Sequence, residues 1–87
     1  AWSVELSETA ARDLGHLDSQ PRKVLRFLHD RVSKLDVPRS IGKALRGSRL
    51  GEFWRYRVGD DRLICRIQDD RLAVLVLRIG HRKEVYR

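Results

Sequence analysis

Several residue types and patterns that define common protein classes are scarce or absent in this chain. It has one cysteine, Cys65, which excludes a disulfide scaffold and a zinc site built from a cysteine cluster. Its longest apolar run, Leu72 to Leu77, is far shorter than the roughly 20 residues that a membrane-spanning helix needs. An alternating segment, Trp2–Leu6, stands where a basic and then apolar signal segment would begin. We therefore expect a cytoplasmic protein with no membrane partner.

Motifs that hold metals, nucleotides or covalent intermediates are missing as well. The sequence has no glycine-rich phosphate loop, no nucleophile elbow and no recognisable paired-carboxylate metal motif. The acidic pairs Asp60–Asp61 and Asp69–Asp70 both fall at predicted turns, where Asp is common for backbone reasons. We therefore expect neither a metal nor a cofactor, and any chemistry on phosphate esters has to use the chain's own side chains.

The chain is short and strongly basic. Its 87 residues include 19 Lys and Arg against 12 Asp and Glu, which gives a net charge of +7. Residues 45–87 carry most of this excess, because they hold 11 of the cations and 6 of the acids, and 10 of those cations are Arg. A guanidinium group offers phosphate a planar fork of donors. The charge therefore indicates a polyanionic partner, although a solvated basic surface would have the same composition.

The first half of the chain predicts a strand and two helices. Residues 2–6 alternate between apolar and polar, as a half-buried strand does. Ser7 is a typical N-cap, and apolar residues at helical spacing continue to Leu17. A second helix is expected from Pro21, with its apolar stripe extending to Leu35. The two helices should lie antiparallel, joined by a short turn.

The second half predicts strands. Residues 38–51 are loop-like, with a short helical turn possible near residues 41–45, and from Glu52 onward the hydrophobic period is two. The expected order is β-α-α-β-β-β in a single domain over residues 1–87. This order predicts an α+β fold, in which two helices pack on one face of a mainly antiparallel four-stranded sheet.

A two-residue turn at Gly59–Asp60 is predicted to join two of these strands. The resulting register pairs Arg57 with Arg62 and Tyr56 with Leu63, and it separates charged from apolar side chains. Trp54, Tyr56, Leu63 and Cys65 share the core face, and Arg55, Arg57, Arg62 and Arg66 share the other. Directly opposed like charges cost roughly 0.2–1 kcal/mol, so structure alone would not select this pairing. A bound polyanion would turn the repulsion into affinity, whereas side chains that splay into water would leave a solvated surface.

The segment from Ile79 to Tyr86 adds a titratable group and an aromatic ring. His81 can serve as acid or base near neutral pH, although a surface role is the alternative. Tyr86 can stack on a nucleobase. With the arginines, these groups suit RNA cleavage in which the substrate's own 2′-hydroxyl attacks the adjacent phosphate. DNA lacks that hydroxyl, so such an activity would be restricted to RNA.

Three segments, Lys43–Gly47, Trp54–Ile64 and Ile79–Tyr86, carry a resemblance to a known family. In these segments and in its order of elements the chain resembles the RelE toxins of the RelE/ParE superfamily, small basic bacterial proteins encoded beside an antitoxin. The resemblance covers nearly the whole chain. It implies a toxin of a type II toxin–antitoxin system, an endoribonuclease that cuts mRNA in the ribosomal A site by metal-independent 2′-hydroxyl attack. Such a toxin inhibits translation and arrests growth.

The resemblance also implies roles for individual residues. Arg62 matches the arginine that contacts the scissile phosphate, and Arg82 matches the one that supports the leaving group or acts as the acid. Tyr86 matches the tyrosine that stacks on a base. Arg55 and Arg57 occupy the basic strand positions of the family site. The remaining cations expected to bind RNA or the ribosome are Lys43, Arg46, Arg66 and Lys83.

One position departs from the family pattern. The family's proposed general base is often a lysine, and this chain has Arg57 there. A guanidinium group stays protonated throughout the physiological pH range and is a poor general base. Either Arg57 only stabilises charge, or His81 takes the proton-transfer role.

Two other functions remain open at this point. A ParE-like protein of the same fold poisons DNA gyrase without catalysis, although such chains generally lack the full set of basic strand, arginine and terminal tyrosine. The other alternative is an RNA-binding module without catalysis. The partners implied by the resemblance are an acidic RelB-like antitoxin, the ribosome and mRNA. Operator DNA would be contacted only through the antitoxin.

Overall fold

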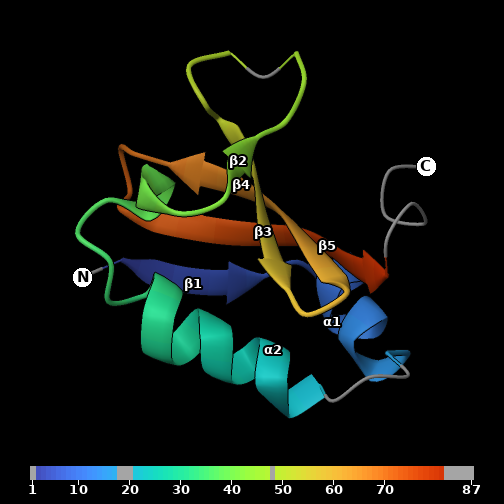
Figure 1. Cartoon of the computed structure of the whole chain (residues 1–87). Helices are drawn as coiled ribbons and strands as arrows, with labels where there is room; N and C mark the ends of the chain where they lie inside the picture. Colours follow the sequence, from blue (N-terminus) through green and yellow to red (C-terminus); the bar gives the residue numbers. More distant parts are fainter. Residues whose placement is uncertain (1, 18–20, 48, 82–87) are drawn as a thin grey trace.

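The chain forms a five-stranded sheet with its helices on one face (Figure 1). The computed structural model describes residues 2–17, 21–47 and 49–81. The strands are β1 (Ser3–Leu6), β2 (Lys43–Ala44), β3 (Phe53–Val58), β4 (Asp61–Gln68) and β5 (Ala73–His81). The helices are α1 (Glu8–Gly15) and α2 (Pro21–Phe27), followed by a π-helical turn over Leu28–Val32 and a 3₁₀ turn over Pro38–Ser40. The strand order is β1-β5-β4-β3-β2; β1 is parallel to β5, and the other neighbours are antiparallel.

The α+β class and the mainly antiparallel sheet are confirmed, but the sheet has one strand more than predicted. The helical turn expected near residues 41–45 is wrong, because this segment pairs with β3 as the short edge strand β2. Two long-range bonds hold it extended. The Trp54 indole donates to the Ile41 carbonyl at 2.7 Å, and Leu45 N–H donates to the Phe53 carbonyl at 3.0 Å.

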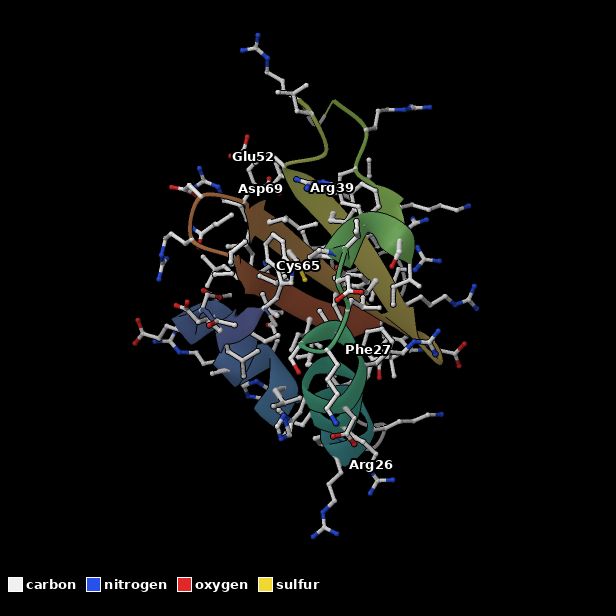
Figure 2. The ribbon with its side chains drawn as sticks, turned by 90° about the vertical axis from the view of Figure 1, so that its left-hand side faces the viewer. Arg26, Phe27, Arg39, Glu52, Cys65 and Asp69 are labelled. Atoms are coloured by element: carbon white, nitrogen blue, oxygen red, sulfur yellow. The ribbon has the colours of Figure 1, made fainter. Side chains whose placement is uncertain are left out.

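One core joins the helices to the sheet. Its buried members are Ala10, Val24, Leu28, Val32, Tyr56, Val58, Leu63, Cys65, Val74, Val76 and Ile79. Tyr56 is 1% exposed, and its hydroxyl donates to the Pro38 carbonyl at 2.6 Å. The Phe27 ring packs edge-on against it, between α2 and the sheet (Figure 2). In the described ranges, no helix has the length and apolar character needed to cross a membrane.

The hairpin of β3 and β4 has the predicted register. Gly59 occupies the turn with a φ of +61°, a conformation that glycine adopts without strain. Arg57 lies opposite Arg62, and Tyr56 lies opposite Leu63. Charged and apolar side chains are therefore separated onto two faces, as the alternation in the sequence predicts.

A β-bulge interrupts the pairing of β4 with β5. Ile64 pairs with Arg78, but the next residue, Cys65, pairs with Val76, so that β5 has one extra residue at this point. The bulge shifts the phase of β5, because Val76 and Ile79 are both buried although they are three positions apart. Strict alternation from Val76 would have turned Arg78 into the core; the bulge turns it outward.

We predict opposite effects on stability for two glycine-to-alanine substitutions. At Gly42, which has a φ of +82°, a Cβ would overlap the Arg55 carbonyl oxygen and lie 2.6 Å from Trp54 Nε1. Gly42→Ala should therefore lower the free energy of unfolding by more than about 1 kcal/mol. Gly15 ends α1 with nothing within 4 Å of a Cβ, so Gly15→Ala should raise it by roughly 0.4–1 kcal/mol. Urea denaturation measures both, and equal stabilities would contradict the path described for residues 41–44.

Candidate nucleic-acid interface

Six basic side chains share the sheet face that points away from the helices. Successive residues of a strand point to opposite faces, and Tyr56, Leu63 and Cys65 point into the core, so their neighbours project outward. We call this surface the basic face. It comprises Lys43 of β2, Arg55 and Arg57 of β3, Arg62 and Arg66 of β4, and Arg78 of β5.

One row of this face crosses four strands. Lys43 is paired with Arg55, Arg55 with Ile64, and Ile64 with Arg78. Ile64 is only 8% exposed although it lies on the side away from the core. The row therefore has an apolar centre with cations on both sides, and the stems of long basic side chains can cover such a centre.

A second row contains the two arginines that the sequence predicts to be opposed. Arg57 pairs with Arg62, and Arg62 pairs with Gly80, which adds no side chain to the row. The Arg57 Nε donates to the Gly59 carbonyl oxygen at 2.9 Å, which draws this guanidinium towards the turn. The cross-strand pairing of Arg57 with Arg62 that the sequence predicts is therefore present in the folded chain.

Arg66 and Arg78 of this face pair with carboxylates. Arg66 Nε lies 2.8 Å from Glu52 Oε1, so its charge is partly balanced. Arg78 Nε lies 2.9 Å from Asp13 Oδ2 on α1, and the Ile79 N–H donates to the same oxygen at 2.9 Å. Arg78 was missed by the sequence reasoning. The available signal was a single arginine inside an otherwise apolar central strand.

The environment of Asp13 holds its carboxylate in the charged form. Partial burial alone would raise the pKa of Asp13, but the hydrogen bonds from Arg78 and from the Ile79 N–H, with the positive charge of Arg78, lower it below the ordinary value of 3.8. The side chain is 17% exposed. An anion is therefore fixed at the junction of α1 and β5.

The loop between β2 and β3 carries Arg46 and projects away from the side on which α2 lies (Figure 1). Arg39 anchors the end of this loop. Its Nε donates to the Gly51 carbonyl at 3.1 Å, and its two terminal nitrogens bind both oxygens of Asp69 at 2.8 and 2.9 Å. Figure 2 shows Arg39 beside Asp69 at the end of the sheet. Sequence reasoning did not identify Arg39, because its partners are distant in the chain.

The structure does not bring every predicted site residue to the basic face. His81 pairs with Asp61, which puts it on the helix-covered side of the sheet, and its Nε2 lies 3.9 Å from Asp60 Oδ2 in the hairpin turn. Arg82, Lys83 and Tyr86 lie outside the described residues. In the ranges that are described, no three His, Cys, Asp or Glu side chains gather in a way that could hold a metal ion.

Known proteins resemble this chain over most of its length. A family model described as the ParE toxin of the type II toxin–antitoxin system parDE matches residues 4–86. Toxin RelG of Mycobacterium tuberculosis is 37% identical, in an alignment that covers 99% of this chain and 97% of that protein.

Solved structures show the same fold. The crystal structure of the toxin–antitoxin complex RelBE2 from Mycobacterium tuberculosis contains a chain that is 36% identical, with a TM-score of 0.76 over 93% of this chain and 91% of that one. The intact RelBE toxin–antitoxin complex of E. coli contains one that is 24% identical, with a TM-score of 0.73 over 95% of this chain and 99% of that one.

We predict that Asp13 makes stability depend on acidity. Its pKa is lower in the folded than in the unfolded chain, so its stabilisation is fully present above about pH 4 and is lost as the pH falls through the folded value. Asp13→Asn should be less stable than the wild type at neutral pH and should lose less stability on acidification. Urea unfolding between about pH 7 and pH 3 measures this. Parallel curves for the two proteins would contradict the ion pair. Glu8→Gln, which removes an exposed carboxylate of the same helix, should change the neutral stability little.

Proposed function

This chain is a RelE-type toxin of the RelE/ParE superfamily, the toxin of a type II toxin–antitoxin system, and from that premise we propose that it is a ribosome-dependent endoribonuclease that cuts mRNA in the A site. The observation that carries the proposal is the opposition of Arg57 and Arg62 on a sheet face shared with Arg55. Three guanidinium groups at neighbouring register positions can together donate charge-assisted hydrogen bonds to one phosphate.

The proposed reaction uses the substrate's own nucleophile. The 2′-oxygen of one nucleotide forms a bond to the adjacent phosphorus, and the bond from that phosphorus to the 5′-oxygen of the next nucleotide breaks. The products are a 2′,3′-cyclic phosphate and a 5′-hydroxyl. Negative charge grows on the phosphate during the attack, and fixed cations stabilise it. We assign this electrostatic role to Arg62, which contacts the scissile phosphate, with Arg55 and Arg57 beside it.

Repulsion within the basic face supports a role in binding. The pairings Arg57–Arg62 and Lys43–Arg55 each place two cations directly opposite one another. Like charges directly opposite one another generally cost roughly 0.2–1 kcal/mol. A phosphate between the members of a pair removes this cost, so part of the repulsion is recovered as affinity. Arg46, on the projecting loop, extends the same positive surface towards more distant phosphates of the RNA backbone.

Proton transfer is a separate requirement of the reaction. Arg57 stays protonated at physiological pH and serves as a charge stabiliser, not as the general base. The register position of His81 is on the opposite side of the sheet from Arg57 and Arg62. Arg82 and Tyr86 keep the roles that the family resemblance implies, as leaving-group support and base stacking.

The proposed protein partner is an acidic, RelB-like antitoxin. Solved relatives of this chain are complexes of RelE-type toxins with RelB antitoxins. An acidic segment would neutralise a toxin of net charge +7 and would compete with RNA for the same cations. We assign contact with operator DNA to the antitoxin, because the basic face of the toxin cannot bind duplex DNA and RNA at the same time.

We predict that purified wild-type protein cuts mRNA in the A site of programmed ribosomes. Arg62→Ala and Arg57→Ala should each slow cleavage by about a hundredfold or more, since losing one charge-stabilising donor costs roughly 2.7–4 kcal/mol in comparable sites. Primer extension on the recovered mRNA measures the cuts. Arg82→Ala should behave in the same way and should relieve growth arrest in cells.

The matched control is Arg26→Ala, which removes an exposed guanidinium that points away from the sheet on α2 (Figure 2). This variant should cleave at close to the wild-type rate. Absence of A-site cuts by the folded wild-type protein would contradict the proposed function. Inhibition of DNA supercoiling by gyrase would then favour a ParE-like activity, and RNA binding without cleavage would favour a non-catalytic module.

We predict that His81→Gln keeps the pH dependence of the cleavage rate. The side chain is about half exposed, near Asp60, and does not share a face with the opposed arginines. A pH–rate profile of single-turnover cleavage, recorded for both proteins, is the measurement. Loss of a titration step from the pH–rate profile of the variant would contradict this prediction and would assign the proton transfer to His81.

A further inference from the structure

We propose that Arg78 is a phosphate-binding residue of the basic face and that Asp13 is the positioning residue that holds it there. The inference rests on the proposed function, because the phosphate in question belongs to bound RNA. It adds a contact outside the hairpin of β3 and β4. The chemistry recognised is a backbone phosphodiester next to the one that is cleaved.

The β-bulge is the first observation that supports this proposal. Bulges re-aim side chains, and they are common beside functional sites. Here the bulge moves Arg78 from the face of Val76, where strict alternation would bury it, to the face of Ile64. The same shift brings Ile79 into the core, where it is 3% exposed. Arg78 therefore points outward from a central strand, and the core keeps its apolar side chains.

The bulge is held in place by side chains at the two ends of α1. The Ser7 hydroxyl, which caps α1 by accepting from the Ala10 N–H at 3.0 Å, donates to the Leu77 carbonyl at 3.0 Å. The Asp13 carboxylate accepts from the Ile79 N–H. Backbone groups on both sides of Arg78, at Leu77 and at Ile79, are therefore bonded to the N-cap of α1 and to Asp13 within it. The direction in which Arg78 leaves the strand is fixed by these bonds.

The Arg78 guanidinium is held by one nitrogen only. Asp13 engages Nε, and within the described part of the chain no other hydrogen bond or ion pair involves this side chain. The side chain is 44% exposed. Its two terminal amino groups are the part that forms a bidentate pair with phosphate. A carboxylate behind the guanidinium and an open fork in front of it make a preorganised anion-binding group.

The position of Arg78 separates its target from the scissile phosphate. It lies on β5, two strands from Arg55 and Arg57 on β3, or about 10 Å across the sheet. Ile64 lies between Arg55 and Arg78 in the same row. Arg62 is nearer, on the neighbouring strand β4, but the Arg78 guanidinium is tied to Asp13 of α1. We therefore assign to Arg78 a phosphate other than the one held by Arg57 and Arg62. Two such contacts fix the direction of the RNA strand over the face.

The first experiment compares Arg78→Ala and Arg78→Lys with the wild type. Arg12→Ala is the matched control, because Arg12 pairs with Glu8 on the same helix that carries Asp13 but lies off the basic face. Binding of a fluorescein-labelled single-stranded RNA is followed by anisotropy across a range of salt concentrations. Single-turnover A-site cleavage is measured against protein concentration. Urea unfolding confirms that each variant is folded.

Arg78→Ala should bind RNA about threefold to tenfold more weakly and should lower the slope of log K against log salt by about 0.7, the value for one phosphate contact on a single strand. Its half-saturating concentration for cleavage should rise while its maximal rate stays the same, because Arg78 contacts a phosphate that does not react. Arg78→Lys should recover part of the affinity, since it restores the charge but not the fork. Arg12→Ala should keep both the slope and the half-saturating concentration.

The second experiment tests positioning by Asp13 through the direction in which the affinity for RNA changes. Removal of an acid makes the protein more positive, so a purely electrostatic change would tighten RNA binding, and Glu8→Gln should do this slightly or not at all. Asp13→Asn should instead weaken binding, because Arg78 loses the group that orients it. In the Arg78→Ala background, Asp13→Asn should have no further effect on binding, which a double-mutant cycle measures. If Asp13 acted on stability alone, Asp13→Asn would shift the urea midpoint of unfolding. Its effect on RNA binding would then be additive with that of Arg78→Ala.

The outcomes separate this inference from the proposed function. If the wild type cleaves and Arg78→Ala matches Arg12→Ala in slope and half-saturation, Arg78 binds no phosphate and the inference is overturned while the function stands. If the wild type binds RNA without cutting it, the proposed function fails, and the salt slope still decides for or against Arg78. If the wild type neither cuts nor binds RNA, both are overturned.

Discussion

The alternation of side chains along the paired strands β3 and β4 is the constraint on which both the core and the basic face depend. A shift of one residue in their register would exchange the two sets, exposing Tyr56 and Leu63 and burying Arg57 and Arg62. Full burial of a large apolar side chain contributes about 1.5–3 kcal/mol. The repulsion between opposed arginines costs roughly 0.2–1 kcal/mol per pair. Core burial therefore wins, and the fold holds an arrangement of charge that would not assemble by itself.

The sequence could predict the features of the fold that depend on neighbouring residues. The hairpin register follows from local information, a glycine-containing turn and a strict alternation on either side of it, and it is confirmed. The strand β2 could not be foreseen, because it has two residues and exists through contacts of Ile41 and Gly42 with Trp54 and Arg55. Its place in the sheet is set by tertiary packing, and it has no period of its own.

The bulge in β5 had no local signal either. It depends on bonds from Ser7 to Leu77 and from Asp13 to Ile79, which join residues about 65–70 positions apart. An apolar run with one arginine predicts a central strand and leaves the direction of that arginine open. Its direction decides whether Arg78 belongs to the core or to the basic face. The sequence therefore predicts the hairpin part of the candidate site, and only the tertiary structure adds the part on β5.

Two acidic side chains, Glu52 and Asp13, orient cations of the basic face. Exposed ion pairs contribute about 0–1 kcal/mol to stability, so the pair of Glu52 with Arg66 adds little, whereas Asp13 is 17% exposed and also accepts from the Ile79 N–H. Each engages its arginine through Nε and restricts where the remaining donors point. A guanidinium that is already oriented loses less conformational entropy when it binds phosphate. In the proposed function, where RNA competes with an acidic antitoxin for the same cations, this preorganisation would increase the affinity for RNA without adding net charge.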